Sequence, residues 1–556
     1  PVNSSPSVLL QPIQRLPSWL FYLLAALCRA LAMPGWLGGW GWPLIFVAVA
    51  LRLVGWQRCR NLWLDYCAGV VFWVLSFAFL VHVQWLAPVG AALILGSCWW
   101  VEGLLFRFLS RRLSSPAAGM LALPCAEYLR MTWFYLGVGG VPWASLGFAL
   151  EPSPLLPLAN VLGESGFVLL ATFGWVLLLV VCGKAPRRFA LPVILLLAIG
   201  FALRTPRPLA ASALRCLSIQ PVVRVDDKNR IFSAADFFDV QLKITDAAFQ
   251  AGVQADLLLW GETMWPFPGV DSQGVGEMRR PWVGAPDEVR SLASVRRRQQ
   301  EMVKVVMEYA TNPVERPLHF LVGAHFYYPV DPAAPAGVYS PRNTEFVLFN
   351  REGELLQHFS KQQLVPFGES LPLGGNFPGA ELFVRWAHRT FGLRPDFGRT
   401  EQTGPLHGGG ALPRLGGAVC WENVFEDSFR SQAQQGAQAF VILSNEDWFG
   451  HDGLEMKQMV AATRLRALES GLAILRSTNT GQTCLVDADG TVELGPNPGE
   501  ITWWLADLPI APASAPATPY RSWGWSLLPI WSLLAALIAV FSVFVNPLAK
   551  AARQPS

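Results

Sequence analysis

The chain has 556 residues, of which 52% are hydrophobic and only 15% are charged, and it contains 24 tryptophans. This composition is too apolar for an ordinary soluble protein of this length and indicates a membrane protein. The formal net charge is only +3, and the basic residues are scattered in short groups, so the sequence argues against a nucleic-acid partner. None of the nine cysteines forms a CxxC pair or a metal-ligand spacing, so we expect no metal site, no cofactor and no disulfide framework.

Seven apolar stretches occupy the first 204 residues, and one more lies near the C-terminus. Several are shorter than the about 20 residues that a bilayer usually requires, so their boundaries are soft. We expect an N-terminal membrane domain over residues 1–204 with seven transmembrane helices, and a last transmembrane helix with its tail over 521–556. The stretches are Trp19–Leu31, Gly39–Val54, Cys67–Val83, Pro88–Phe106, Ala117–Leu136, Gly163–Val181, Leu191–Leu203 and Leu527–Val545.

The basic residues between these stretches occupy alternate connections. Under the positive-inside rule, this alternation places both termini in the cytoplasm and the domain between the seventh and eighth spans outside it. Arg204 and Arg207 lie on the opposite side and go against this orientation. The basic groups are Arg52, Arg58 and Arg60, then Arg107, Arg111 and Arg112, then Lys184, Arg187 and Arg188, and finally Lys550 and Arg553.

Glu127 and Arg130 are three residues apart within the fifth apolar stretch. On a helix they lie on the same face and partly neutralise each other. Two interpretations fit this spacing, a structural ion pair and a contact with a lipid headgroup.

After Arg204 the sequence changes to alternating strand and helix patterns with many charges, which predicts a second domain over residues 205–520. Three of its segments end an apolar strand or hairpin with a reactive side chain. "LLLWGETMWP" presents Glu262, "FSKQQLVPFGESLP" presents Lys361 and Glu369, and "RLGGAVCWENVF" places Cys420 on a strand-to-helix turn. Each residue by itself is more simply explained as a loop charge or a core thiol.

Together, these residues form a plausible set for covalent catalysis. A cysteine nucleophile needs a base to remove its proton and a cation to stabilise the negative intermediate. Glu262 supplies the base, while Lys361 is expected to lower the pKa of the thiol and to stabilise an oxyanion. No histidine occupies a comparable motif, which disfavours a cysteine–histidine protease.

The order Glu262, Lys361, Cys420 resembles the Glu-Lys-Cys triad of the nitrilase superfamily. The stretches "KQQLVPFGESLP", "AVCWENVF", "LSNEDWFG", "RLRALESGLAILRSTNTG" and "ATPYRSWG", set between seven leading spans and one trailing span, resemble bacterial apolipoprotein N-acyltransferases. The chain departs from that family's usual pattern in two places, with Trp260-Gly261-Glu262 in place of Trp-Pro-Glu and Cys420-Trp421-Glu422 in place of Cys-Tyr-Glu.

The resemblance implies an αββα nitrilase-like sandwich on the periplasmic side of the bacterial inner membrane. It implies a two-step transfer of an acyl chain from a phospholipid donor to the N-terminal amine of a diacylated apolipoprotein, with Cys420 as nucleophile. It assigns Glu369 and Glu422 as supporting acids. We expect a monomer in contact with membrane lipid.

Four aromatic residues are candidates for substrate contact. Trp265 follows the Glu262 turn, Trp421 follows Cys420, and Trp448 and Phe449 lie in "SNEDWFG". Core packing is an equally good interpretation of Trp265, and Trp448 and Phe449 either line the site or pack beneath it.

Two other functions remain open at this stage. A membrane-tethered amidase acting on a small amide would use the same triad, but it would not need a tryptophan-rich membrane domain. A non-catalytic lipid-binding relative would be expected to lack at least one triad residue.

Overall fold

The computed structural model describes residues 16–551, except for 133–139, 182–185, 207–209, 225–232, 272–275, 281–287, 311–316, 334–338, 372, 374–375, 377, 392–396, 399–403, 411 and 451–452. The chain divides into two compact units. The helical unit comprises the described residues of Pro1–Trp133, Val141–Arg204 and Trp523–Ser556, and the α/β unit comprises those of Phe134–Gly140 and Thr205–Ser522.

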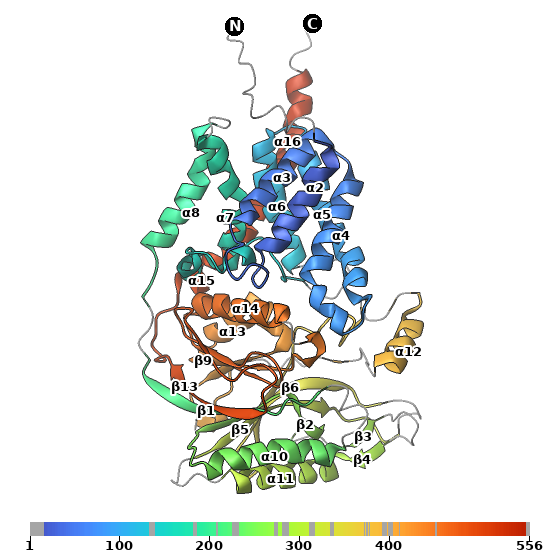
Figure 1. The fold of residues 1–556 in the computed structure, drawn as a ribbon, viewed down its shortest axis with the longest axis vertical. Coiled ribbons are helices and arrows are strands. Elements are labelled where there is room, and N and C mark those ends of the chain that lie inside the picture. The colour runs from blue at the N-terminus through green and yellow to red at the C-terminus, as the bar shows by residue number, and fades with distance from the viewer. Residues whose placement is uncertain are drawn as a thin grey trace. The chain divides into compact units, whose positions relative to one another are not determined.

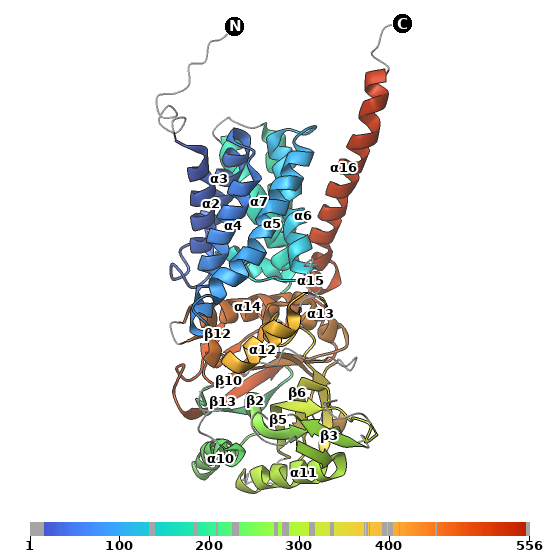
Figure 2. The ribbon, with the colours of Figure 1, turned by 90° about the vertical axis from the view of Figure 1, so that its right-hand side faces the viewer.

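Each of the eight apolar stretches contributes a helix to the helical unit (Figures 1 and 2). α7 is interrupted at Gly163, whose φ of 58° and ψ of −170° are not helical. Glycine adopts this conformation without the steric cost that a side chain would add. The helices are α2 (Ser18–Ala32), α3 (Leu44–Arg58), α4 (Leu62–Ser76), α5 (Ala87–Leu109), α6 (Ser115–Thr132), α7 (Ala159–Val181), α8 (Leu191–Ala202) and α16 (Leu527–Ala551).

Three helical segments of the described chain are long and apolar enough to cross a membrane, namely Ala87–Leu109, Leu156–Leu177 and Gly524–Phe541. The helices Ser18–Ala32 and Leu62–Ser76 are apolar but shorter. Helix length and composition therefore agree with a membrane protein, while the count of eight spans stays a prediction.

Six buried ionisable side chains form one connected network inside the helical unit. Three are arginines and three are acids, so their formal charges cancel, and they come from five successive helices, α2 to α6. The ion pairs are Arg52–Asp65 at 3.0 Å, Arg52–Glu102 at 3.2 Å, Arg29–Glu102 at 3.6 Å, Arg29–Glu127 at 2.5 Å and Arg130–Glu127 at 2.6 Å.

The predicted pair of Glu127 and Arg130 lies at one end of this network and also binds backbone. Arg130 donates hydrogen bonds to the carbonyl oxygens of Val141 and Trp143, and the Leu146 N–H donates to Glu127 at 3.2 Å. The residues that follow Gly140 are buried but are not part of a regular helix, so their polar groups need such partners. These contacts agree with the structural interpretation of the pair.

We expect Glu127→Gln to destabilise the helical unit, because it leaves Arg29 and Arg130 buried without their shared counter-charge. Removing one partner of a buried ion pair costs about 3–5 kcal/mol. The measurement is the thermal unfolding of the purified protein in detergent, with the exposed Arg187→Gln as a matched loss of charge in the same unit. Equal unfolding temperatures for the two variants would show that the network does not stabilise the fold.

Two sheets form the centre of the α/β unit (Figure 1). The six-stranded sheet has the order β13-β1-β2-β5-β6-β7, with β1, β2 and β5 parallel, and the five-stranded sheet has the order β12-β11-β10-β9-β8, with β8, β9 and β10 parallel. The strands of the first sheet are β1 (Ser212–Gln220), β2 (Leu257–Gly269), β5 (His319–Tyr327), β6 (Arg342–Phe349), β7 (Leu355–Ser360) and β13 (Thr502–Ile510). Those of the second are β8 (Leu415–Val419), β9 (Ala439–Ser444), β10 (Ile474–Thr478), β11 (Cys484–Val486) and β12 (Val492–Leu494).

The core of the α/β unit has three apolar layers, which identify the αββα arrangement. Between the sheets, side chains such as Leu257 and Leu259 of β2 meet Val441 and Leu443 of β9. A second layer lies between the first sheet and the helices α10 (Ala234–Gln250) and α11 (Leu292–Tyr309), and a third between the second sheet and the helices α13 (Glu426–Gln434) and α14 (Leu454–Ser470) (Figure 1). Strands such as β9 read as continuous apolar runs because both of their faces are buried.

Candidate active site

Glu262 projects from an irregular part of β2. The pairing of β2 with β5 shifts register between Trp260 and Trp265, and Thr263 in this bulge has a φ of 55°. The opposing residue on β5 is Gly323, and a Cβ atom there would lie 2.6 Å from the Glu262 Cα atom. Glycine at 323 therefore leaves the room that the bulge needs to present its carboxylate.

Lys361 directly follows β7, and its backbone N–H donates to the Thr344 carbonyl oxygen at 2.8 Å. Its Nζ atom lies 3.1 Å from Glu262 Oε1 and 3.0 Å from Glu369 Oε1. The lysine side chain is only 1% exposed, so its ammonium group is held between two carboxylates away from bulk water. Glu369 is fixed in turn by the Val365 N–H, which donates to its other oxygen at 2.8 Å.

Cys420 directly follows β8 and begins a short 3₁₀ helix over Cys420–Val424, the strand-to-helix turn that the sequence indicates. Its φ of 50° is uncommon for a residue with a side chain and costs backbone energy, a feature that concentrates at functional sites. Cys420 is buried, and the charges of Glu262 and Lys361 both act on its thiol. The structure thus brings together Glu262, Lys361 and Cys420, which are up to 158 positions apart in the sequence.

The electrostatics favour a neutral thiol beside a carboxylate and an ammonium group. Burial and the negative charge of Glu262 raise the pKa of Cys420 well above its ordinary value, and the opposing effect of Lys361 is smaller. Burial lowers the pKa of Lys361, but Glu262 and Glu369 outweigh it and leave that pKa well above its ordinary value. The expected lowering of the thiol pKa by the lysine is therefore outweighed, and the thiol requires a base.

Burial also raises the pKa of Glu262, while Lys361 lowers it and Glu369 raises it further. A carboxylate with a raised pKa is a stronger base than an exposed one and holds an abstracted proton more readily. The arrangement can therefore move a proton from the thiol to Glu262 and stabilise negative charge near Lys361.

Glu422 connects the lysine segment to the cysteine segment. Its Oε1 atom accepts from the backbone N–H groups of Gln362 at 2.7 Å and Gln363 at 3.1 Å, and its Oε2 atom accepts from the Val419 N–H at 2.9 Å. These donors directly flank Lys361 and Cys420. Glu422 therefore fixes the two segments relative to each other through the backbone.

The four predicted aromatic contacts occupy different surroundings. Trp265 is 3% exposed and packs among Phe238, Phe267 and Phe349 in the layer beneath α10 and α11, so its position departs from the predicted substrate contact and fits core packing. Its ring is covered by other aromatic side chains of this layer. Trp421 is half-buried and meets Phe425 edge-on, while Trp448 and Phe449 are half-buried in a 3₁₀ turn over Asp447–Phe449.

Two further features near the triad were not anticipated from the sequence. The backbone N–H of Asn445 donates to Glu262 Oε2 at 3.0 Å. The next residue, Glu446, forms a fully buried ion pair with Arg476 of β10. The stretch "SNEDWFG" indicated this turn. The sequence could not indicate the bond to Glu262, because every residue except proline has a backbone N–H.

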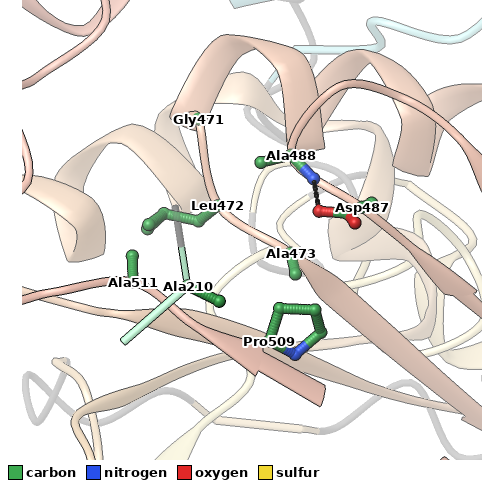
Figure 3. Close-up of a pocket in the computed structure, with 8 residues that line it drawn as sticks. All are labelled: Ala210, Gly471, Leu472, Ala473, Asp487, Ala488, Pro509 and Ala511. Carbon is green, nitrogen blue, oxygen red and sulfur yellow. Dashed lines mark hydrogen bonds between the residues drawn. The ribbon is translucent and has the colours of Figure 1, made fainter. Parts of the chain in front are cut away.

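A separate small cavity lies elsewhere in the α/β unit (Figure 3). Its volume is about 10 Å³, which is room for about one water molecule. Its lining includes Ala210, Leu472 and Pro509 and none of the predicted site residues, so it is not the candidate site. Over the described residues, no cluster of three or more His, Cys, Asp or Glu side chains has a metal-binding arrangement.

The sequence is similar to known proteins over most of its length. The carbon-nitrogen hydrolase family profile matches residues 333–514, which include Lys361 and Cys420. An apolipoprotein N-acyltransferase from Sinorhizobium medicae is 29% identical over 453 residues, covering 77% of this chain and 75% of that protein. One from Rhizobium etli is 27% identical over 481 residues, 79% of each chain, and one from Geobacter metallireducens is 25% identical over 445 residues, 76% of this chain and 75% of that protein.

Among solved structures, an amidase from Nesterenkonia sp. aligns with 57% of this chain and 95% of its own, at 16% sequence identity and a TM-score of 0.34. Similarity at this level says nothing about activity. The sequence matches, by contrast, run through both units of the chain. Residues 333–514 therefore contain a carbon-nitrogen hydrolase domain, and the chain is similar to apolipoprotein N-acyltransferases over about three quarters of its length.

Proposed function

We propose that this protein is an acyltransferase that moves an acyl chain from a phospholipid to the N-terminal amine of the diacylglyceryl-cysteine of apolipoproteins. The observation that carries the proposal is the buried contact of Lys361 with Glu262 and Glu369 beside the Cys420 thiol. It occurs in a chain whose sequence is similar to apolipoprotein N-acyltransferases over about three quarters of its length. The catalytic domain in this proposal spans 205–520, with membrane segments over 1–204 and 521–556.

In the first half of the reaction, Glu262 accepts the Cys420 proton as the sulfur attacks the ester carbonyl of the phospholipid. Lys361 stabilises the oxyanion of the tetrahedral intermediate. When the intermediate collapses, the bond to the glycerol oxygen breaks and Glu262 returns the proton to that oxygen. The products are a lysophospholipid and an acyl thioester on Cys420.

In the second half, the unprotonated amine of the apolipoprotein attacks the thioester carbonyl. Lys361 again stabilises the oxyanion, and Glu262 accepts a proton from the attacking nitrogen. Collapse breaks the carbon–sulfur bond, and the proton returns to the sulfur. An amide forms, and the enzyme regains its neutral thiol.

The membrane part of the proposal has eight spans in the bacterial inner membrane, with the catalytic domain in the periplasm and the protein acting as a monomer. Large apolar side chains of α16 are exposed in the helical unit, including Ile530 at 61%, Leu533 at 60% and Phe541 at 70%. Exposed apolar rows of this kind suit contact with lipid chains. The alternating basic connections support the orientation.

The orientation is tested by labelling single introduced cysteines, in a variant whose accessible native thiols are replaced. Ala293→Cys and Pro186→Cys both occupy exposed positions, on α11 and in the connection after α7. In intact spheroplasts, a membrane-impermeant maleimide should label position 293 and should label position 186 only after lysis. Labelling of both positions before lysis would reject the topology.

The covalent intermediate is tested with phospholipid alone. Because the thioester forms before the acceptor binds, a Cys420 peptide should gain one fatty-acyl mass, and hydroxylamine should remove it. A diacylated lipopeptide with a free α-amine should discharge the enzyme, and the same peptide with a blocked amine should not. Cys484→Ala is the matched control, since Cys484 is also fully buried but lies outside the site. Discharge by small amides in place of lipopeptide would favour the amidase.

The clamp formed by Glu422 is tested by Glu422→Gln. The substitution keeps the shape but turns one acceptor oxygen into an NH₂ group, which then faces backbone N–H donors at Val419 or at Gln362 and Gln363. Displacing these segments should lower the rate of Cys420 acylation by about 10–100-fold, since small misplacements of reacting groups are costly. The mostly exposed Asp427→Asn, which loses an acid seven residues after the nucleophile, should retain full activity. Equal acylation rates for both variants would show that Glu422 does not position Lys361 and Cys420.

A further inference from the structure

Asn479, the first residue after β10, binds two other segments of the α/β unit. Its Nδ2 atom donates to Asn445 Oδ1 at 2.9 Å and to the Val223 carbonyl oxygen at 2.7 Å, and its Oδ1 atom accepts from the Val223 N–H at 2.9 Å. Its backbone N–H donates to the Ser444 carbonyl oxygen at 3.0 Å. The side chain is fully buried, and these bonds tie together the segments that follow β1, β9 and β10.

These bonds hold one particular peptide group, the one that joins Ser444 to Asn445. Its carbonyl oxygen accepts from the Asn479 N–H, and its N–H donates to Glu262 Oε2 at 3.0 Å. Hydrogen bonds arranged in such a chain polarise one another in a buried environment. The Asn479 backbone N–H thus holds the carbonyl side of this peptide, its side-chain amide holds the Asn445 side chain, and the Asn445 N–H is left to donate to Glu262.

The same edge of the sandwich contains other polar links between the two sheets. Ser218 of β1 and Ser477 of β10 share a hydrogen bond of 2.6 Å, and Thr483 donates to Gln220 at 2.9 Å. Ser477 is fully buried like Asn479 and lies two residues before it, but its hydroxyl contacts Ser218 and not the Ser444–Asn445 peptide. It therefore offers a matched comparison for the loss of a buried polar group.

We propose that Asn479 is a positioning residue for Glu262, acting through Asn445 to fix the backbone N–H that binds the second carboxylate oxygen of the base. Lys361 binds the first oxygen and the Asn445 N–H binds the second, so each oxygen has a fixed donor. The inference rests on the proposed function only in taking Glu262 as the base.

The charged and titratable groups around Glu262 are Lys361 after β7, Glu369 in the following loop and Cys420 after β8. On the side of β9 and β10, Glu446 and Arg476 pair with each other. Asn479 itself does not titrate, so any effect of replacing it on the pH profile must pass through these groups.

The direction of the effect follows from which form of Glu262 the peptide binds. A hydrogen bond donated to a carboxylate stabilises the charged form and lowers its pKa. Loosening the Asn445 N–H should therefore raise the pKa of Glu262 further above its ordinary value. Since the base must be unprotonated to act, the acid limb of the pH profile should move to higher pH.

The test compares Asn479→Ala with Ser477→Ala in the full-length protein. The first readout needs no lipid: it is the pH dependence of Cys420 alkylation by iodoacetamide, measured by mass spectrometry. The second is the acylation of Cys420 by phospholipid. In Asn479→Ala the acid limb of the profile should move up by about one pH unit. At pH values below this limb, Cys420 should react about tenfold more slowly than in the wild type. Ser477→Ala should keep the wild-type profile.

Asn445→Ala provides a second route if Asn479→Ala does not fold. It retains the N–H that binds Glu262 but loses the Oδ1 acceptor for Asn479, and it should shift the profile in the same direction. An unshifted profile in a folded Asn479→Ala or Asn445→Ala variant would overturn the inference, as would an equal shift in Ser477→Ala. If wild type never acylates Cys420 yet alkylation shifts as expected, the positioning role stands and the proposed acyl transfer fails.

Discussion

The candidate site is organised around one buried ammonium group, that of Lys361, held about 3 Å from the carboxylates of Glu262 and Glu369. A buried ion is costly unless its partners are close and are themselves hydrogen-bonded. Both conditions are met here, because the Val365 N–H binds Glu369 and the Asn445 N–H binds Glu262. The cation cannot leave without stranding two acids, so it remains beside Cys420 as a fixed positive charge that requires no reorganisation during a reaction.

The surroundings of Cys420 determine when its thiol can act as a nucleophile. In many cysteine enzymes a low thiol pKa supplies the nucleophile, but here burial and the nearby carboxylate raise the pKa of Cys420. The resting thiol is then a poor nucleophile, and it becomes a good one when Glu262 removes its proton. Such a site suits a substrate that is brought in and positioned, as the proposed phospholipid would be.

The helical unit uses buried charge in a different way. Its network of three arginines and three acids is neutral as a whole and links five helices. Aromatic rings also surround these cations, and the Arg52 guanidinium lies 3.9 Å from the ring centre of Trp99. Helices that are apolar on all sides have few features to fix their register, and specific ion pairs provide one. The exposed surfaces of helices such as α16 remain apolar.

The sequence by itself determined the residue types of the site and the order of the elements that carry them. Glu262, Lys361 and Cys420 each follow an apolar run that the sequence shows locally, although the structure places Glu262 at a bulge inside β2 and not at the end of a strand. The apolar stretches likewise predicted the positions of α2 to α8 and α16, because long apolar runs need little context to form helices. The tertiary structure decided which of these features meet. Glu422 and Asn479 bind backbone groups about 60 and 256 residues away, and no local pattern encodes such partners. The place of Trp265 was also decided only by packing, since an aromatic side chain near a turn fits a core and a binding surface equally well.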